Sequence, residues 1–128
     1  MLFKKDSSFE GLKVLVLGVA YKKNTDDIRE SIALRIIEGL FISGAKISYS
    51  DPYIPRIKKI FRQYRFFGPN SVALTSENLR KYNHVVLLTD HDAFDYQFIY
   101  NNSKTIIDTK GAFGKIKDVY EKIIAASI

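Results

Sequence analysis

One stretch of this chain constrains its fold more than any other: an apolar run, then a crowded polar turn, then an amphipathic segment. Residues 14–17 are wholly apolar and end at Gly18, which is typical of a strand covered on both faces of a parallel sheet. The turn at 21–31 holds a lysine pair, two adjacent aspartates and an arginine. Over residues 32–41, apolar side chains recur at spacings of one, three and four, which predicts a helix. The chain is therefore predicted to begin with a strand, a polar turn and a helix.

The next segments continue this alternation. Ser31 is the predicted N-cap of the first helix, and Gly44 its stop. A second strand is predicted over 47–49, closed by a turn at 51–55 that contains two prolines. A second helix is predicted over 56–65. Its apolar face and its basic face consist of Ile57, Ile60, Phe61 and Tyr64, and of Lys58, Lys59, Arg62 and Arg65.

The second half of the chain repeats the pattern. Residues 71–74 fit either a strand or an extended lead into a small helix capped by Thr75 or Ser76. Strands are predicted over 85–88 and 105–107, a short helix with Phe94, Phe98 and Ile99 between them, and a closing helix over 116–124. Together the elements predict an α/β fold: one Rossmann-like domain over 11–128 with a doubly wound, mostly parallel sheet. Residues 1–10 are expected to be a flexible lead-in.

Composition excludes several classes of function. A chain of 128 residues can bury one core, and no segment approaches the roughly 20 apolar residues of a membrane span. Since there is no cysteine, the chain supplies no disulfide, thiolate metal site or cysteine nucleophile, and we expect a cytoplasmic protein. No histidine pair has metal-ligand spacing, and no nucleophile elbow is present. The absence of G-x-G-x-x-G argues against dinucleotide binding by this domain alone.

Polar residues follow each predicted strand. They occupy positions 21–29, Asp51, 89–92 and 109–111. Because ligands of such sheets bind outside the carboxyl ends of the strands, we expect these turns to converge on one crevice. Lys22, together with Lys23 and Lys110, is suited to hold phosphate oxygens, assisted by the positive end of the helix that begins near Ser31. The net charge of +6 is compatible with an anionic partner. This set of residues favours binding over catalysis.

The segment Gly18 to Ser31, with Asp51-Pro52-Tyr53 and Thr89-Asp90-His91, resembles the C-terminal UDP-binding domain of the UDP-glucose/GDP-mannose dehydrogenase family. The resemblance covers about residues 11–123. Thr89-Asp90-His91 followed by Phe94-Asp95-Tyr96 is most similar to the UDP-N-acetylhexosamine 6-dehydrogenases within that family.

The resemblance implies a role in an NAD-dependent enzyme of polysaccharide biosynthesis. Members oxidise the C6 hydroxyl of a nucleotide sugar to a carboxylate with two NAD molecules, through a thiohemiacetal on a cysteine. The implied partners are a UDP-sugar and two parts missing here, an N-terminal domain that binds NAD and a central helical region that carries the cysteine. No nucleic acid and no membrane is implied, and the chain alone should not be catalytic.

The resemblance also implies roles for single residues. Tyr21 and Lys22 match the aromatic-lysine pair that contacts the nucleotide sugar. Lys110 stands where the family usually has an arginine, and a lysine lacks the bidentate fork that an arginine offers a phosphate. Ile32 replaces a frequent proline at the first helical position.

Other candidate residues have a structural interpretation beside the ligand-binding one. Asp26, Asp27 and Arg29 can form a salt-bridged scaffold that holds Lys22 in position. His91 is either a turn residue or a substrate contact, and Thr89 belongs to the same turn. Asp51 can brace the turn at Pro52 without any ligand.

Two other functions fit parts of the sequence. The basic segment 56–65, with its interleaved aromatics, can be read as a nucleic-acid surface, although helical spacing places the aromatics on the buried face. A steep salt dependence of oligonucleotide binding would support that reading. A phosphoacceptor domain also has carboxylates at strand ends. However, Asp26 and Asp27 lie far beyond the first strand, and Asp51 follows the second strand instead of the third.

Overall fold

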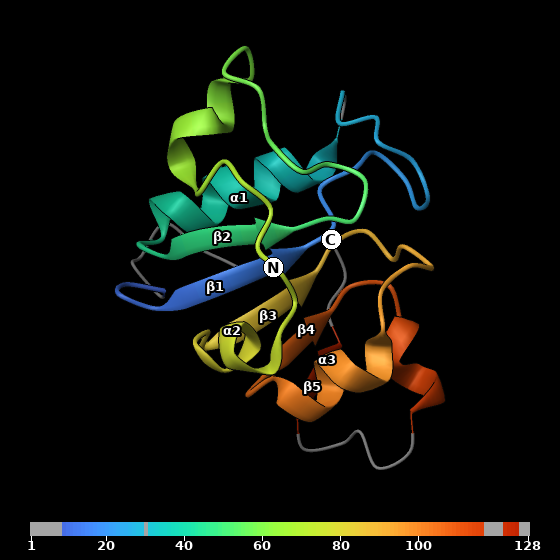
Figure 1. The fold of residues 1–128 in the computed structure, drawn as a ribbon. Helices are drawn as coiled ribbons and strands as arrows, with labels where there is room; N and C mark the ends of the chain where they lie inside the picture. The colour runs from blue at the N-terminus through green and yellow to red at the C-terminus, as the bar shows by residue number, and fades with distance from the viewer. Residues whose placement is uncertain (1–8, 30, 117–121, 126–128) are drawn as a thin grey trace.

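A five-stranded, wholly parallel sheet forms the centre of the computed structural model, which describes residues 9–29, 31–116 and 122–125. In chain order the strands are β1 (Lys13–Leu17), β2 (Lys46–Ser50), β3 (His84–Leu87), β4 (Ile106–Asp108) and β5 (Ile123–Ala125). Their order in the sheet is β2-β1-β3-β4-β5 (Figure 1). The chain therefore moves outward from β1 in one direction and then in the other. This confirms the predicted doubly wound, Rossmann-like fold, with its switch point between β1 and β3.

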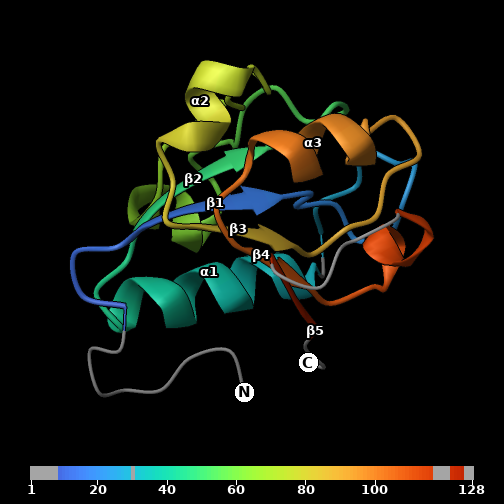
Figure 2. The ribbon, with the colours of Figure 1, turned by 90° about the horizontal axis from the view of Figure 1, so that it is seen from below.

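Helices cover both faces of the sheet. Helix α1 (Ile32–Ile42) lies on one face, and α2 (Ser76–Arg80) and α3 (Tyr96–Asn102) lie on the other (Figure 2). Two short 3₁₀ helices, η1 (Arg62–Phe66) and η2 (Ala112–Lys115), complete the described elements. The prediction for α1 is confirmed at both ends. The Ser31 hydroxyl accepts a hydrogen bond from the Ala33 amide at 3.1 Å, and Gly44 follows the helix with a φ of +96°.

The alternation of side chains along β1 divides the core in two. Val14 and Val16 pack against α1, while Leu15 and Leu17 pack toward α2 and α3. All four are fully buried, as predicted for a central strand of a parallel sheet. The two faces thus share residues 14–17 of β1, whose side chains have no contact with water, whereas Lys13 at the start of the strand is exposed.

The outer edge of β2 is covered by the segment 67–72, which we call the edge segment. The Gly68 amide donates to the Ile47 carbonyl at 3.1 Å, and the Val72 amide donates to the Tyr49 carbonyl at 2.8 Å. An antiparallel bridge between Arg56 and Asn70 joins the other side of this segment to the chain that follows β2. The outward-facing carbonyls of β2 are thereby paired.

The predicted helix over 56–65 is wrong. Only Arg62–Phe66 is helical, as the 3₁₀ helix η1, and Ile60 is 85% exposed instead of buried. The backbone pairs elsewhere, because the Ile57 amide donates to the Pro69 carbonyl at 2.8 Å. The α1 side of the core still includes Ile57, Phe61 and Tyr64. The apolar pattern therefore predicted which of these side chains are buried, but it did not predict the backbone conformation.

The predicted closing helix over 116–124 is also wrong where the structure describes it. Ile123–Ala125 forms β5, which pairs parallel to β4, and the Ile106 amide donates to the Lys122 carbonyl at 2.7 Å. Two adjacent β-branched residues favour a strand wherever a sheet edge is available to pair with them. Residues 117–121 of this prediction lie outside the described residues.

The remaining element predictions can be compared directly. Thr75 is the N-cap of α2, and its hydroxyl accepts a hydrogen bond from the Asn78 amide at 3.1 Å. The residues before it are an extended lead, one of the two predicted alternatives. Phe94 precedes α3, whose N-cap is Asp95. Residues 1–8 of the expected lead-in lie outside the described residues, while the Phe9 amide donates to the Ser43 carbonyl at 3.1 Å.

Candidate functional site

The end of β1 touches the turn after β3 directly. Gly18 has a φ of +82°, and a Cβ atom at this position would lie 2.5 Å from both the Cβ and the carbonyl oxygen of Thr89. The Thr89 hydroxyl in turn donates to the Ala20 carbonyl at 2.9 Å. Only glycine permits both the backbone conformation and the close approach. The switch point is thus closed by contacts between these two turns.

A buried carboxylate at the end of β2 binds to both of these turns. Asp51 Oδ2 accepts hydrogen bonds from the Val19 amide and from His91 Nε2, each at 2.9 Å. Its Oδ1 accepts from the Tyr53 amide at 2.9 Å. Asp51 and His91 are 3% and 0% exposed. Asp51 therefore joins the carboxyl ends of β1, β2 and β3.

The hydrogen bonds of His91 assign its tautomer. Nδ1 lies 2.8 Å from the backbone amide nitrogen of Asn24, which can only donate, so Nδ1 accepts and carries no proton. Nε2 then carries the proton and donates to Asp51. The ring is consequently neutral, and the pair with Asp51 is a hydrogen bond of a neutral imidazole to a carboxylate.

The tip of the loop after β1 is held by Asn24. Its φ is +62°, a conformation that asparagine tolerates better than most residues. Its side chain donates from Nδ2 to Asp92 at 2.8 Å and accepts from the Asp92 amide at 2.9 Å. Lys23 Nζ lies 3.8 Å from Asp92, an exposed pair that adds little stability. Asn24 was not among the predicted site residues, although its tolerance of left-handed backbone was a usable signal.

The second half of that loop is braced by Asp27 and Arg29. The carboxylate of Asp27 accepts from the Arg29 backbone amide at 2.9 Å, from its Nε at 3.1 Å and from its Nη2 at 3.2 Å. These bonds to Arg29 lower the pKa of Asp27. The Tyr21 amide donates to the Asp27 carbonyl at 2.6 Å. Asp26 is exposed, and its carboxylate makes no hydrogen bond or ion pair with the described part of the chain.

The three predicted ligand contacts are all exposed. Tyr21 is 56% exposed, and within the described ranges the ammonium groups of Lys22 and Lys110 form no hydrogen bond or ion pair. The turn that carries Lys110 is fixed by Asp108, whose Oδ1 accepts from the Lys110 and Gly111 amides at 2.9 and 2.8 Å. Asp108 was missed as a positioning residue. An aspartate three residues before a glycine is a usual turn signal.

Two clefts border this edge of the sheet. One, of about 1250 Å³, lies between residues 25–29 and residues 53–61. The other, of about 480 Å³, is lined by Asp51, by residues 71–74 and by part of residues 93–99. Tyr21, Lys22 and Lys110 line neither cleft. The polar turns do meet at the carboxyl edge as expected, but at the switch point they bind one another in place of forming an open crevice.

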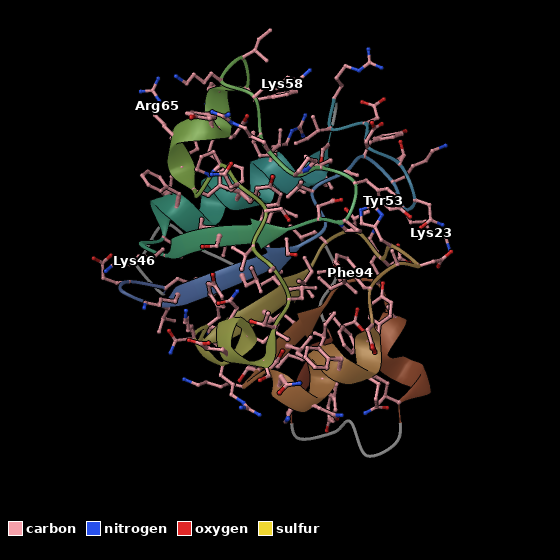
Figure 3. The ribbon with its side chains drawn as sticks, in the orientation of Figure 1. Lys23, Lys46, Tyr53, Lys58, Arg65 and Phe94 are labelled. Carbon is pink, nitrogen blue, oxygen red and sulfur yellow. The ribbon has the colours of Figure 1, made fainter. Side chains whose placement is uncertain are left out.

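The two ends of the parallel strands carry different side chains. Lys23, Tyr53 and Phe94 lie on the carboxyl side of the sheet, whereas Lys46, the first residue of β2, lies at the opposite end (Figure 3). The ring of Tyr53 packs edge-on against His91, with centroids 4.9 Å apart.

The first βα corner does not fit a dinucleotide. Thr89 occupies the space beside Gly18 in which a pyrophosphate would have to approach the backbone. At the start of α1, the Ala33 amide already donates to the Ser31 hydroxyl. Among the described residues, no group of three or more histidine or acidic side chains is placed to hold a metal ion. No described helix has the length and apolar character needed to cross a bilayer.

Comparison with known proteins places the chain in a family. Residues 15–115 match the UDP-binding domain of the UDP-glucose/GDP-mannose dehydrogenase family. A UDP-glucose 6-dehydrogenase of Rickettsia bellii is 30% identical over 108 residues, which cover 82% of this chain and 25% of that protein. A UDP-glucose 6-dehydrogenase of Oryza sativa is 32% identical over 117 residues, covering 75% of this chain and 24% of that protein.

Solved structures of dehydrogenases are also similar to this chain. The UDP-D-ManNAc dehydrogenase of Pyrococcus horikoshii is 25% identical with a TM-score of 0.64, covering 93% of this chain and 26% of that one. An NDP-N-acetyl-D-galactosaminuronic acid dehydrogenase of Methanosarcina mazei shares the fold with a TM-score of 0.69 at 20% identity, covering 94% of this chain and 25% of that one. The chain thus spans about a quarter of the length of these relatives. It belongs to the UDP-glucose/GDP-mannose dehydrogenase family and corresponds to the family's UDP-binding domain.

Proposed function

We propose that this domain binds the UDP portion of a UDP-sugar for an NAD-dependent UDP-sugar 6-dehydrogenase. The observation that carries the proposal is the loop after β1. It is tied to the other strand ends through Asp51 and His91, yet it leaves the side chains of Tyr21 and Lys22 exposed. A fixed backbone that presents an aromatic ring and an ammonium group without a partner among the described residues is suited to a base or sugar ring linked to a pyrophosphate.

The turn after β4 supplies the second positive charge in this proposal. Lys110 is exposed, and two hydrogen bonds from its turn to Asp108 fix the backbone beneath it. The chemistry of the two lysines is that of point charges, because an ammonium group does not form the planar fork of a guanidinium. Such contacts attract a pyrophosphate without fixing its orientation, so other parts of the enzyme would have to orient the substrate.

The rest of the enzyme supplies what this chain lacks. We assign NAD binding and the catalytic cysteine to other parts, because the corner at Gly18 does not fit a dinucleotide and the chain contains no cysteine. The nucleotide sugar is proposed to carry an N-acetylhexosamine. Thr89-Asp90-His91 followed by Phe94-Asp95-Tyr96 supports this assignment, as does the similarity to the enzyme of Pyrococcus horikoshii. We place the complete enzyme in the cytoplasm, in polysaccharide biosynthesis.

Calorimetric titration of the chain with UDP tests the proposal. We expect weak binding, because the remainder of the pocket is absent, and weaker binding of GDP. Lys22→Ala should weaken UDP binding by roughly ten- to a hundredfold, since one charge-assisted contact to phosphate contributes roughly 1.5–3 kcal/mol. Lys46→Ala is the matched control, because Lys46 is an exposed lysine at the opposite end of the sheet.

Two results would contradict the proposal. One is a folded chain that binds no UDP at millimolar concentration. The other is an equal loss of affinity in the Lys22 and Lys46 variants, which would mean that only the overall positive charge attracts the nucleotide. Thermal unfolding of both variants checks that each keeps the fold.

A further inference from the structure

We propose that His91 is the positioning residue of the loop at 19–29, and that it holds this loop only while its imidazole is neutral. The contact at issue is the hydrogen bond from the Asn24 amide to His91 Nδ1, which we call the latch. Its importance for ligand binding rests on the function proposed above. The latch itself is independent of that function.

The ring has one orientation available. Nε2 is held by Asp51 at 2.9 Å, and Asp51 is itself held by the Val19 and Tyr53 amides. The rings of Tyr53 and Phe94 pack on the imidazole at centroid distances of 4.9 and 5.6 Å. The fully buried ring therefore cannot turn to offer Nε2 to the loop.

Protonation opens the latch without detaching the ring. A proton on Nδ1 would face the amide hydrogen of Asn24 across 2.8 Å, which places two donors against each other. The Nε2 bond to Asp51 would become an ion pair and would persist. The bond from Asn24 is thus lost first, and it is the bond that joins the ring to the loop at Asn24.

The surroundings of His91 favour release of the loop over movement of the histidine. The Tyr96 hydroxyl donates to the His91 carbonyl at 2.7 Å, and burial, aided by nearby carboxylates, raises the pKa of that hydroxyl so that it stays a donor. Among the described residues, the titratable and charged groups around the ring are Asp51, Tyr53 and Tyr96, the carboxylates of Asp90, Asp92 and Asp108 that act on Tyr96, and, through Asp92, Lys23.

Release at Asn24 changes the site because Lys22 lies two residues away on the same loop. Without the latch, the bonds of Asn24 that remain within the described part of the chain are its exposed side-chain bonds to Asp92 at the loop tip. Exposed hydrogen bonds restrain a loop weakly, so Lys22 loses its fixed position. Ligand affinity should therefore decrease as His91 becomes protonated.

The first test follows the latch without any ligand. The chain has two histidines, so ¹⁵N-labelled histidine gives two sets of imidazole signals. While the latch is closed we expect an unprotonated Nδ1 on His91. On acidification, the hydrogen-exchange protection factor of the Asn24 amide should fall in step with protonation of His91, as its own ¹⁵N signals report it, by tenfold or more.

Variants provide the controls. His91→Gln keeps an N–H for Asp51 and a carbonyl acceptor for Asn24 but does not titrate, so Asn24 protection should no longer depend on pH. His84→Gln removes the other histidine, at the amino end of β3, and should leave the pH dependence of Asn24 protection as it is in the unmodified chain. UDP-glucose serves as the ligand probe, because its pyrophosphate keeps the same charge across this pH range.

Each outcome has a defined meaning. The proposal is supported if UDP-glucose affinity decreases on acidification, approaching tenfold per pH unit, and if His91→Gln abolishes this slope. It is overturned if Asn24 protection does not change when His91 is protonated, or if the UDP-glucose affinity of the unmodified chain and that of His91→Gln depend on pH to the same extent. If the exchange data show the latch but no UDP-glucose binds at any pH, the latch stands and the proposed function fails.

Discussion

At the scale of single residues, Gly18 and Gly111 show how differently two left-handed glycines can be constrained. Both have positive φ, +82° and +73°. A Cβ at Gly18 would overlap Thr89, whereas a Cβ at Gly111 would meet nothing within 4 Å. The backbone conformation is therefore the only constraint at Gly111, and the close approach of two chain segments is added at Gly18.

Alanine substitution should separate these two effects. Gly111→Ala should lower the free energy of unfolding by about 1–2 kcal/mol, the cost of a left-handed L-residue. Gly18→Ala should lower it by roughly 3–5 kcal/mol, because overpacking adds to the backbone strain. Urea denaturation measures both values. Equal costs would show that Thr89 moves away freely and that the contact is not a constraint.

At the scale of secondary-structure elements, Ser31 connects a helix to a strand end. Its hydroxyl accepts from the Ala33 amide and donates to the Val19 carbonyl at 2.8 Å. The serine is 6% exposed. The first turn of α1 is therefore fastened to the residue that also donates its amide to Asp51, so both ends of the long loop after β1 meet at Val19.

Ser31→Ala should lower the free energy of unfolding by about 2–3 kcal/mol, because it removes an N-cap and leaves the Val19 carbonyl without its partner. Thr75→Ala is the comparison. It removes the exposed cap of α2 and should cost about 0.5–1 kcal/mol. Chemical denaturation of both variants gives the difference. A cost at Ser31 no larger than that at Thr75 would rule out a role for the carbonyl contact.

Element prediction from the sequence succeeded where one helical face was apolar and both ends carried capping signals. Helix α1 had Ser31 and Gly44 at its ends, and its bounds differ from the prediction by one residue. The segment 56–65 had an apolar pattern without a matching cap, and it follows Pro55. Its backbone pairs with residues 69 and 70, a partner that no local pattern could reveal.

At the scale of the whole molecule, a half-buried histidine links folding to pH. Burial lowers the pKa of His84, and its Nδ1 is buried without a hydrogen-bond partner in the part of the chain that the structure describes. The unfolded chain therefore takes up this proton at a higher pH than the folded domain does. Stability associated with neutral His84 is complete above about pH 6.5 and is lost as the pH falls toward the lower folded value.

The free energy of unfolding should accordingly decrease between pH 7 and pH 5, and His84→Gln should remove part of that decrease. Urea titrations of the unmodified chain and of His84→Gln at several pH values measure the effect. Because both proteins contain His91, any difference between them comes from His84. An unchanged slope in the variant would show that protonated His84 is accommodated in the fold.

The sequence predicted which residues lie at the candidate site, but it did not predict the contacts between them. Asp51, Thr89 and His91 were assigned to strand ends from the apolar runs before them, because parallel strands bring their carboxyl ends to one edge. The bond between Asn24 and His91 was not foreseen, since it joins positions 67 residues apart and depends on a left-handed asparagine. The closed switch point has the same origin: it depends on the shape of the loop as a whole.

The edge segment has a consequence for self-association. A bare strand at a sheet border is a template on which a second molecule can add its own strand, the usual route to fibres and swapped dimers. Along β2 that template is already used, because Gly68 and Val72 occupy the carbonyls of Ile47 and Tyr49. Sheet growth through β2 would require 67–72 to detach first, so the domain resists polymerisation at this border.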